Sequence, residues 1–388
     1  MGQTVINTNS PANQKRWGGV LFNSTAHESF FLSHMTDNAR NVENDGEMAN
    51  SPVVVINDLE KNAGDTVNFE IYMQISGNPT FGDDTLEGNE AELGSFMDEI
   101  KINQVRKAAS AGGAMSQKRT PTNLRNMAKN KLKEYFGKWI DQAHFTNLAG
   151  QRGVNPDFEI PLSATSAIPN THEFTDYDAQ HTLYGGNATS KATLNAADTM
   201  KLTTVERALT KAKAEGGGSD KKIRLDPLKK DGNKEAFILL MHTYQAHDLR
   251  ADVGAKGWFE IQRAAATAEG KKSQIFTGEL GWHQGVCLKE HKDVVLLDKY
   301  GAGANVNAAR ASLMGRQALV TAFGNANSRG SANKMRMNWI EEKKDYENKL
   351  AVASGLIFNV KRPIFNNETY GSFAIDTAHS SGTAEIIN

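Results

Sequence analysis

Four histidines in the second half of the chain are the residues whose types could form a catalytic metal site. They are His242, His247, His283 and His291, and the carboxylate of Asp248 lies next to the second of them. Two imidazoles and a carboxylate form a catalytic zinc site in many hydrolases. However, His242 and His247 are five residues apart, about 140° around a helix, and no HExxH pairing occurs. We therefore expect histidines at the surface or at strand ends, and no metal site.

Nucleophiles and phosphate-binding loops are also weakly indicated. Cys287 lies between Val286 and Leu288, an apolar and strand-like setting in which a thiol is inert. No GxSxG turn is present, and the glycine-rich segments 216–218 and 301–303 match neither nucleotide-binding pattern. The sequence therefore predicts no catalytic residue and no cofactor.

Carboxylates gather in a turn-rich segment of the first hundred residues. They are Asp83, Asp84, Glu87, Glu90 and Glu92. Their order differs from that of an EF-hand loop, in which oxygen ligands alternate and a glutamate closes the site. The pattern predicts a solvated loop tip, and its functional alternative is a charged contact with a neighbouring subunit.

Composition indicates a folded protein without a strong electrostatic field. The chain has 388 residues, of which 39% are hydrophobic and 23% charged, and 44 basic against 45 acidic side chains leave a formal charge of -1. Such a balance argues against a DNA-binding protein that holds phosphates by bulk charge. A single cysteine excludes an internal disulfide framework and fits a reducing compartment such as the cytoplasm. The start of the chain does not resemble a secretory signal, and no apolar stretch reaches the length that crosses a bilayer, so we expect no membrane partner.

The first half of the chain predicts an arm, a hairpin and a helix. The first fifty residues show no sustained period and favour an extended arm. Apolar residues then alternate with polar ones over 67–75 and again near Ile100, which predicts a β-hairpin with a loop of about twenty residues, far longer than a tight turn. Thr120 and Pro121 predict the start of one long helix that ends at Gly150. Lys118 and Arg119 are expected near the base of the hairpin.

The residue pattern of the second half of the chain is typical of a mixed helix and strand domain. Residues 151–195 are polar and turn-rich, which predicts a connecting loop. Apolar spacing predicts helices over 194–214 and about 246–253, and strands at 236–241 and 294–297. A strand-rich tail follows over 350–360. The chain therefore predicts an α+β fold.

Several short segments resemble one known family. They are 64–69 (GDTVNF), 82–90 (GDDTLEGNE), 111–117 (AGGAMSQ), 119–120 (RT), 184–188 (YGGNA), 278–281 (GELG), 314–319 (MGRQAL) and 345–348 (DYEN), with Gly355 and Lys361 beyond them. Together they are similar to the major capsid proteins of N-four-like podophages, and the order of arm, hairpin, long helix and α/β region resembles the Hong Kong 97-type capsid fold. The likeness runs from about residue 60 to residue 377.

The resemblance implies a division of the chain and a structural role. An N-terminal arm would span 1–58, an E-loop hairpin 59–110, a P domain 111–194 and 331–362 with a spine helix at about 121–149, and an A domain 195–330 and 363–388. It implies self-assembly into pentamers and hexamers, a portal protein at one vertex, scaffold and decoration proteins, and double-stranded DNA packaged without sequence specificity. The protein would be a virion capsid component assembled in the host cytoplasm. The residues expected to contact neighbouring subunits are Pro79, Asp83, Asp84, Glu87, Glu90, Lys118 and Arg119.

Three alternatives stay open from the sequence. A cellular nanocompartment shell shares the same fold. A metal-dependent hydrolase would use His242, His247 and Asp248. A tail or decoration protein would form rings, tubes or trimers in place of closed shells.

Overall fold

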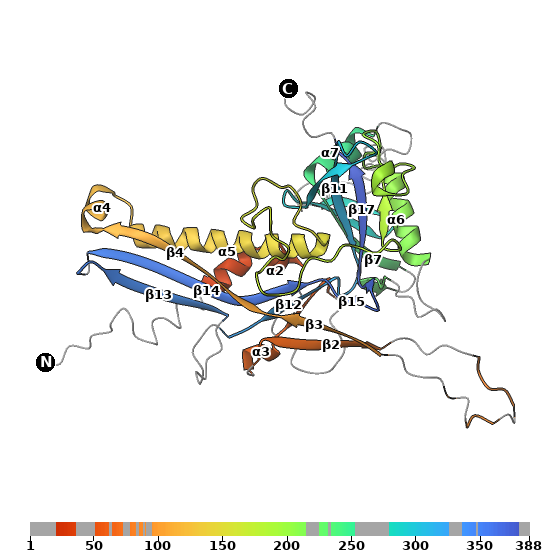
Figure 1. Ribbon diagram of the computed structural model, residues 1–388, viewed down its shortest axis with the longest axis horizontal. Helices are drawn as coiled ribbons and strands as arrows, with labels where there is room; N and C mark the ends of the chain where they lie inside the picture. Colours follow the sequence, from red (N-terminus) through yellow and green to blue (C-terminus); the bar gives the residue numbers. More distant parts are fainter. Residues whose placement is uncertain are drawn as a thin grey trace.

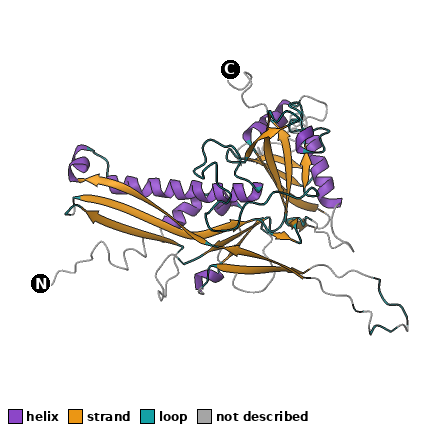
Figure 2. Cartoon of the chain, in the orientation of Figure 1, coloured by secondary structure: helices purple, strands orange, loops and turns teal. Residues whose placement is uncertain are grey.

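The structure is a computed structural model with two large sheets joined by one long helix (Figure 1). It describes residues 21–35, 51–61, 64–72, 78–82, 85–87, 90, 95–214, 225–231, 234–252, 279–325, 336–346 and 348–379. An elongated sheet lies along the helix, a second sheet stands at the C-terminal end of the helix, and a hairpin projects below both (Figure 2). Among the described residues, no helix is long and apolar enough to span a bilayer.

The elongated sheet has five strands in the order β1–β12–β14–β13, with β4 paired along β14. Their bounds are Val53–Ile56 (β1), Asn103–Gly113 (β4), Leu319–Phe323 (β12), Met337–Lys344 (β13) and Lys349–Lys361 (β14). Only β1 and β12 run parallel. The sheet therefore draws β1 from the segment assigned to the arm, β4 largely from the segment assigned to the hairpin, and β12 from the segment assigned to the A domain.

Helix α5 (Leu124–Ala149) covers one face of this sheet. Its 26 residues give a length of about 39 Å at 1.5 Å per residue. Ala128, Leu132, Phe136 and Ile140 recur at helical spacing and are buried in the largest apolar cluster. The long helix is confirmed, but it begins three residues later than predicted, because the side chain of Asn123 and not that of Thr120 accepts the first amide hydrogen bond.

Gly150 ends α5 in the left-handed conformation, at φ 75°. A β-carbon at this position would lie 2.3 Å from the carbonyl oxygen of Thr175. We therefore expect Gly150→Ala to lower the free energy of unfolding by more than the roughly 1–2 kcal/mol that the left-handed backbone alone costs. Gly82→Ala is the matched control in a urea titration, since its φ is 59° and no atom lies within 4 Å of the added carbon. Equal effects of the two substitutions would contradict this account.

The second sheet has eight strands in the order β5–β17–β11–β7–β9–β8, with β10 paired to β11 and β6 to β7. The bounds are Thr182–Tyr184 (β5), Lys229–Asp231 (β6), Lys234–Met241 (β7), Glu279–His283 (β8), Val286–Glu290 (β9), Leu296–Tyr300 (β10), Val306–Met314 (β11) and Ser372–Ala378 (β17). Helices α6 (Leu202–Ala214) and α7 (Thr243–Ala251) bury their apolar residues in the core of this sheet. The predicted strand at 294–297 begins two residues later, and the predicted helix at 194–214 begins only at Leu202, after a short 3-10 turn, η1 (Lys191–Thr193).

Residues 21–35 contradict the prediction of a wholly extended arm. Residues 21–28 are helical, and α2 (Phe30–His34) follows them directly. Leu21, Phe31 and Met35 are buried against α5 and the five-stranded sheet. The helical period was missed because the two helical segments are short, and their stability comes from packing and not from the helix propensity of their residues.

Candidate functional site

The projecting hairpin is formed by β2 (Thr66–Tyr72) and β3 (Ser95–Lys101), which pair in register from Thr66 opposite Lys101 to Tyr72 opposite Ser95. This confirms the predicted hairpin. The described residues of its loop lie beyond the ends of the strands, away from the two sheets (Figure 1). Two large apolar side chains of the loop are exposed, Phe81 at 71% and Leu86 at 64%. Large apolar side chains held away from the body of a subunit are typical of contacts between subunits.

The base of the hairpin is fixed to the body by apolar and charged contacts. Ile100 is fully buried in a cluster with Leu59 and Val320, and the ring of Phe69 packs edge-on against Phe365 at 5.9 Å. Asp98 pairs with Lys361, and its other oxygen accepts from the amide of Ile364 at 3.1 Å. Short elements lie beside the base, α3 (Asp58–Lys61), β15 (Ile364–Phe365) and β16 (Glu368–Thr369). Because its base is fixed to the body, the hairpin projects its exposed tip in a defined direction.

The predicted contact residues fall into two separate groups. Pro79, Glu87 and Glu90 are exposed in the hairpin loop, and Asp83 and Asp84 lie outside the described residues. Lys118 and Arg119 are exposed at the end of α4 (Ala114–Arg119). The expectation that these two lie near the base of the hairpin is wrong, because β4 runs as an 11-residue strand away from the base and carries α4 to the opposite end of the molecule (Figure 1).

A second exposed surface lies at that opposite end and was missed from the sequence. Tyr346, in the turn between β13 and β14, is fully exposed, and Met115, Met127 and Ile340 are also exposed. The first turn of α5 is tied to β13 beneath them, because Arg125 donates to Glu341, which is almost fully buried. The signal in the sequence was the polar segment 345–348, which forms the turn; in the structure Asp345 and Tyr346 both have positive φ.

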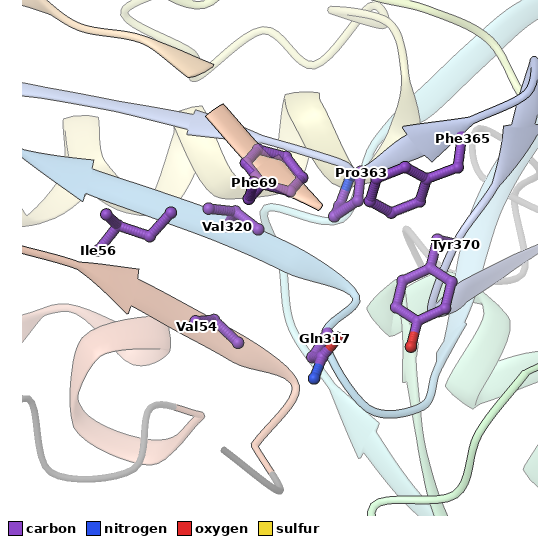
Figure 3. Close-up of a pocket in the computed structure, with 8 residues that line it drawn as sticks. All are labelled: Val54, Ile56, Phe69, Gln317, Val320, Pro363, Phe365 and Tyr370. Atoms are coloured by element: carbon purple, nitrogen blue, oxygen red, sulfur yellow. The ribbon is translucent and has the colours of Figure 1, made fainter. Parts of the chain in front are cut away.

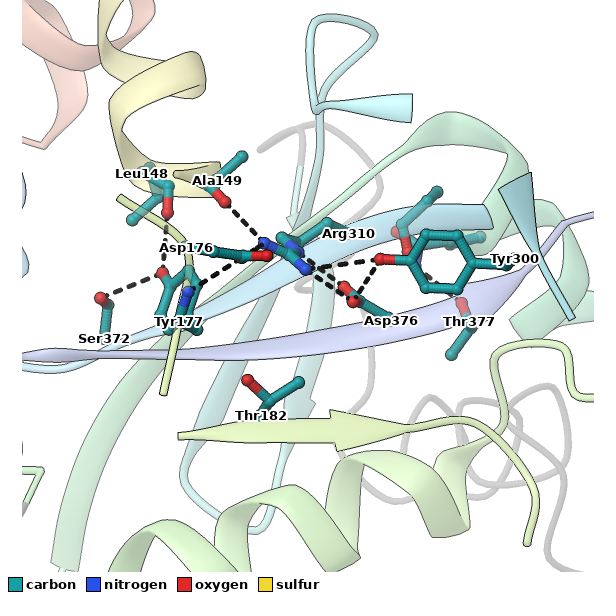
Figure 4. A network of polar contacts seen from close by, with 12 residues as sticks. Leu148, Ala149, Asp176, Tyr177, Thr182, Tyr300, Arg310, Ser372, Asp376 and Thr377 are labelled. Carbon is teal, nitrogen blue, oxygen red and sulfur yellow. Dashed lines mark hydrogen bonds and ion pairs between the residues drawn. The ribbon is translucent and has the colours of Figure 1, made fainter. Parts of the chain in front are cut away.

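A buried polar network joins the end of α5 to the eight-stranded sheet (Figure 4). Arg310 on β11 donates from Nε and Nη2 to the two oxygens of Asp376 on β17, at 2.7 and 2.8 Å, and both side chains are buried. The hydroxyl of Tyr300 donates to Asp376 at 2.8 Å. Burial alone would lower the pKa of Arg310, but Asp376 raises it well above the ordinary value. The guanidinium of Arg310 therefore keeps its charge despite its burial.

The same network satisfies the carbonyl groups that α5 leaves without partners in its last turn. Arg310 donates to the carbonyl of Ala149 at 2.8 Å, and Arg362 donates to that of Leu148 at 3.1 Å. Tyr177 also donates to Leu148, at 2.8 Å, and its ring lies 3.7 Å below the guanidinium of Arg362. Cations at a helix C-terminus complement its dipole. The network therefore fixes the direction of the eight-stranded sheet relative to α5.

Asp141 on α5 holds the N-terminal segment in place. Its carboxylate accepts from the hydroxyl of Ser29 at 2.6 Å and from the amides of Phe30 and Phe31 at 2.9 and 3.3 Å. These are the first amides of α2, which have no partner within the helix. Burial raises the pKa of Asp141 to about 6 despite these donors.

His144 lies one turn further along α5, stacked on the ring of Phe31 at 4.8 Å. Its Nδ1 lies 2.7 Å from the carbonyl oxygen of Ile140, so Nδ1 carries the proton and donates. Nε2 then accepts from the hydroxyl of Thr321 at 3.0 Å. Burial lowers the pKa of His144 to about 4, which leaves this neutral tautomer as the folded form.

Acid is expected to destabilise the fold through His144. Because its pKa falls from 6.5 in the unfolded chain to about 4 in the folded one, the unfolded state binds the proton more tightly. The contribution of His144 to the free energy of unfolding is fully present above pH 6.5 and decreases by on the order of 3 kcal/mol as the pH falls toward 4. Urea titrations of His144→Gln should show a smaller loss over this window, while His247→Gln, with a side chain 57% exposed, should match the unmodified chain. An unchanged pH profile in His144→Gln would contradict this.

Other buried groups add to the acid response of the fold. Burial also lowers the pKa of His172, His242 and His379 to about 4, so their contributions have the same sign as that of His144. Asp141 has the opposite sign: its raised pKa gives stability that increases as the pH falls through 6. The histidines outnumber this single carboxyl, so we expect a net loss of stability on acidification.

The histidines considered as metal ligands have structural partners. His242 follows the last residue of β7 and caps α7, and its Nδ1 accepts from the amide of Tyr244 at 3.1 Å. His283 lies 2.9 Å from Glu206, and His291 stacks on Phe145 at 4.7 Å. Within the described ranges, no three histidine, cysteine or acidic side chains are grouped to hold a metal ion. Cys287 is buried in β9, as its apolar neighbours predict.

Comparisons with known proteins agree on one family. Residues 5–382 match the phage capsid protein family. The major capsid protein of Pseudomonas phage KPP25 is 25% identical over 350 residues, which are 84% of this chain and 87% of that protein. The capsid of Ralstonia phage GP4 is 38% identical, with a TM-score of 0.78, over 98% of this chain and 99% of that one. The capsid of cyanophage Pam1 shares the fold at 19% identity, with a TM-score of 0.64 over 86% and 90% of the two chains. These neighbours confirm the α+β fold of Hong Kong 97 type, and the chain belongs to the phage capsid protein family.

Proposed function

We propose that copies of this phage major capsid protein assemble through pentamers and hexamers into the icosahedral head shell that encloses packaged double-stranded DNA. The hairpin carries the proposal, because it combines a fixed base with exposed apolar side chains at a tip that projects from the subunit. A subunit that reaches across a neighbour needs such a projecting element.

The rest of the subunit fits the same role. The formal charge of -1 allows many copies to pack side by side without strong repulsion, and it gives the chain no net positive charge that would retain DNA. In this proposal the five-stranded sheet with α5 forms the P domain and the eight-stranded sheet forms the A domain. The buried network of Arg310 and Asp376 then sets the angle between the two domains, which decides how tightly capsomers curve.

Further partners follow from the role of a head protein. A portal protein would occupy one vertex, and scaffold and decoration proteins would act on the inner and outer faces of the shell. Assembly in the host cytoplasm agrees with the single cysteine, buried in β9. The family match favours a phage head over a cellular nanocompartment, a tail or decoration protein and a metal-dependent hydrolase.

Native mass spectrometry of the purified full chain tests the proposal. We expect species of five and six copies in equilibrium with the monomer, and larger closed assemblies as the concentration rises. Trimers or tubes as the end product would point to a decoration or tail role. A chain that stays monomeric at every concentration and with each candidate scaffold protein would overturn the proposal.

A further inference from the structure

Different elements pack on the two faces of the five-stranded sheet. Along β1, Val53 and Val55 point into the core under α5, while Val54 and Ile56 point to the other face. On β12 the same alternation places Val320 on that other face. The base of the hairpin covers only part of it, through β2 and β3.

An apolar cavity of about 120 Å³ remains beside the hairpin base (Figure 3). Strands β1 and β12, the hairpin strand β2 and the segment around β15 line it, and one side is open. Its lining residues are Val54, Ile56, Phe69, Gln317, Val320, Pro363, Phe365 and Tyr370. Engineered apolar cavities of roughly 150 Å³ take up benzene, so this one is close to the size of a single phenyl ring.

The hairpin loop carries side chains of matching chemistry. Phe81 and Leu86 are among the most exposed apolar residues of the described chain. They cannot reach the cavity of their own subunit, because β2 and β3 are paired out to Tyr72 and Ser95 and direct the loop away from the base. The cavity and the side chains that fit it therefore lie at separate places on one chain.

We propose that the ring of Phe81 inserts into this cavity on a second copy of the chain, with Leu86 packed at the rim. The inference rests on the proposed function and names the receiving site of the hairpin. A knob and a socket at different places on one chain form a heterologous contact, which closes into a ring when the rotation between copies allows it. One aromatic anchor in an apolar pocket is also how most contact energy is concentrated at protein interfaces.

Cysteine cross-linking of assembled shells tests this contact. Cys287 is buried, so cysteines engineered at exposed or half-buried positions react selectively with a short bismaleimide. Chains with Leu86→Cys and chains with Val54→Cys are assembled together, and the double variant Leu86→Cys/Val54→Cys is assembled alone, so that the ring of Phe81 is kept in every chain. We expect covalent dimers in the mixture and a ladder of up to five or six chains in the double variant. Met115→Cys with Val54→Cys is the control pair, since Met115 is as exposed as Leu86 but lies at the opposite end of the molecule.

A substitution series gives a second readout. Phe81→Ser should raise the concentration needed for assembly at least tenfold, and Phe81→Leu should raise it less, since an aliphatic side chain still fills part of the cavity. Shells that form normally from Phe81→Ser, or shells without the 86–54 cross-link, would overturn the inference and leave the capsid role intact. Failure of the unmodified chain to assemble would instead count against the proposed function.

Discussion

Deletion of residues 79–90 is expected to abolish shell formation while the subunit stays folded. All of the deleted residues that the structure describes, except the half-buried Thr80, are exposed in the loop, and the apolar cluster at the base of the hairpin, with Ile100 and Leu59, does not include them. The subunit therefore keeps its core, while the interface loses Phe81 and Leu86. Circular dichroism and urea unfolding measure the first effect, and electron microscopy of assembly reactions measures the second.

A loop of the same length built from glycine and serine is the control for the deletion. It restores the chain length but not the apolar and acidic side chains, so we expect it to fail in assembly as the deletion does. Normal shells from either variant would show that the loop is dispensable. Loss of the folded subunit in both would show that the loop belongs to the fold.

Asp376→Leu is expected to have the largest effect on subunit stability. It leaves the guanidinium of Arg310 buried without its main partner and removes the acceptor of Tyr300. Breaking a buried ion pair from one side costs about 3–5 kcal/mol. The free energy of unfolding from urea titrations followed by tryptophan fluorescence measures this loss.

The double variant Arg310→Met/Asp376→Leu separates charge from packing. It removes both charges, and replacing a buried pair by apolar side chains is often close to neutral, so it should recover much of the loss. Lys131→Ala is the exposed control: its ion pair with Glu134 has side chains 68% and 52% exposed, and its removal should cost less than about 1 kcal/mol. If Asp376→Leu lowered the free energy of unfolding no more than Lys131→Ala does, the network would not fix the eight-stranded sheet relative to α5.

The elements predicted best from the sequence are those in which apolar residues repeat regularly over many positions. Alternation over 67–75 predicts the hairpin, and the helical spacing of Leu132, Phe136 and Ala143 predicts α5. The end of α5 at Gly150 was also predictable, since a left-handed residue there favours glycine.

The elements that were missed depend on partners distant in the sequence. Residues 21–35 become helical against α5, where Asp141 caps α2 from 111 positions away. Strand β4 follows the hairpin but pairs with β14, about 250 residues later. No local pattern contains these pairings, because register between distant strands is decided by the whole sheet.

The functional residues divide in the same way. The acidic loop was found from its composition, whereas the network of Arg310 and Asp376 was missed. A single arginine among the small apolar residues of 306–314 and a single aspartate in 372–378 were its signals. A buried charge in a strand predicts a partner, but sequence spacing does not say which residue that partner is.

Negative-stain electron microscopy of the purified chain, alone and with candidate scaffold proteins, tests the central claim most directly. The account predicts closed icosahedral shells, or free capsomers with five- and six-fold symmetry. A uniformly monomeric protein under all of these conditions would contradict it.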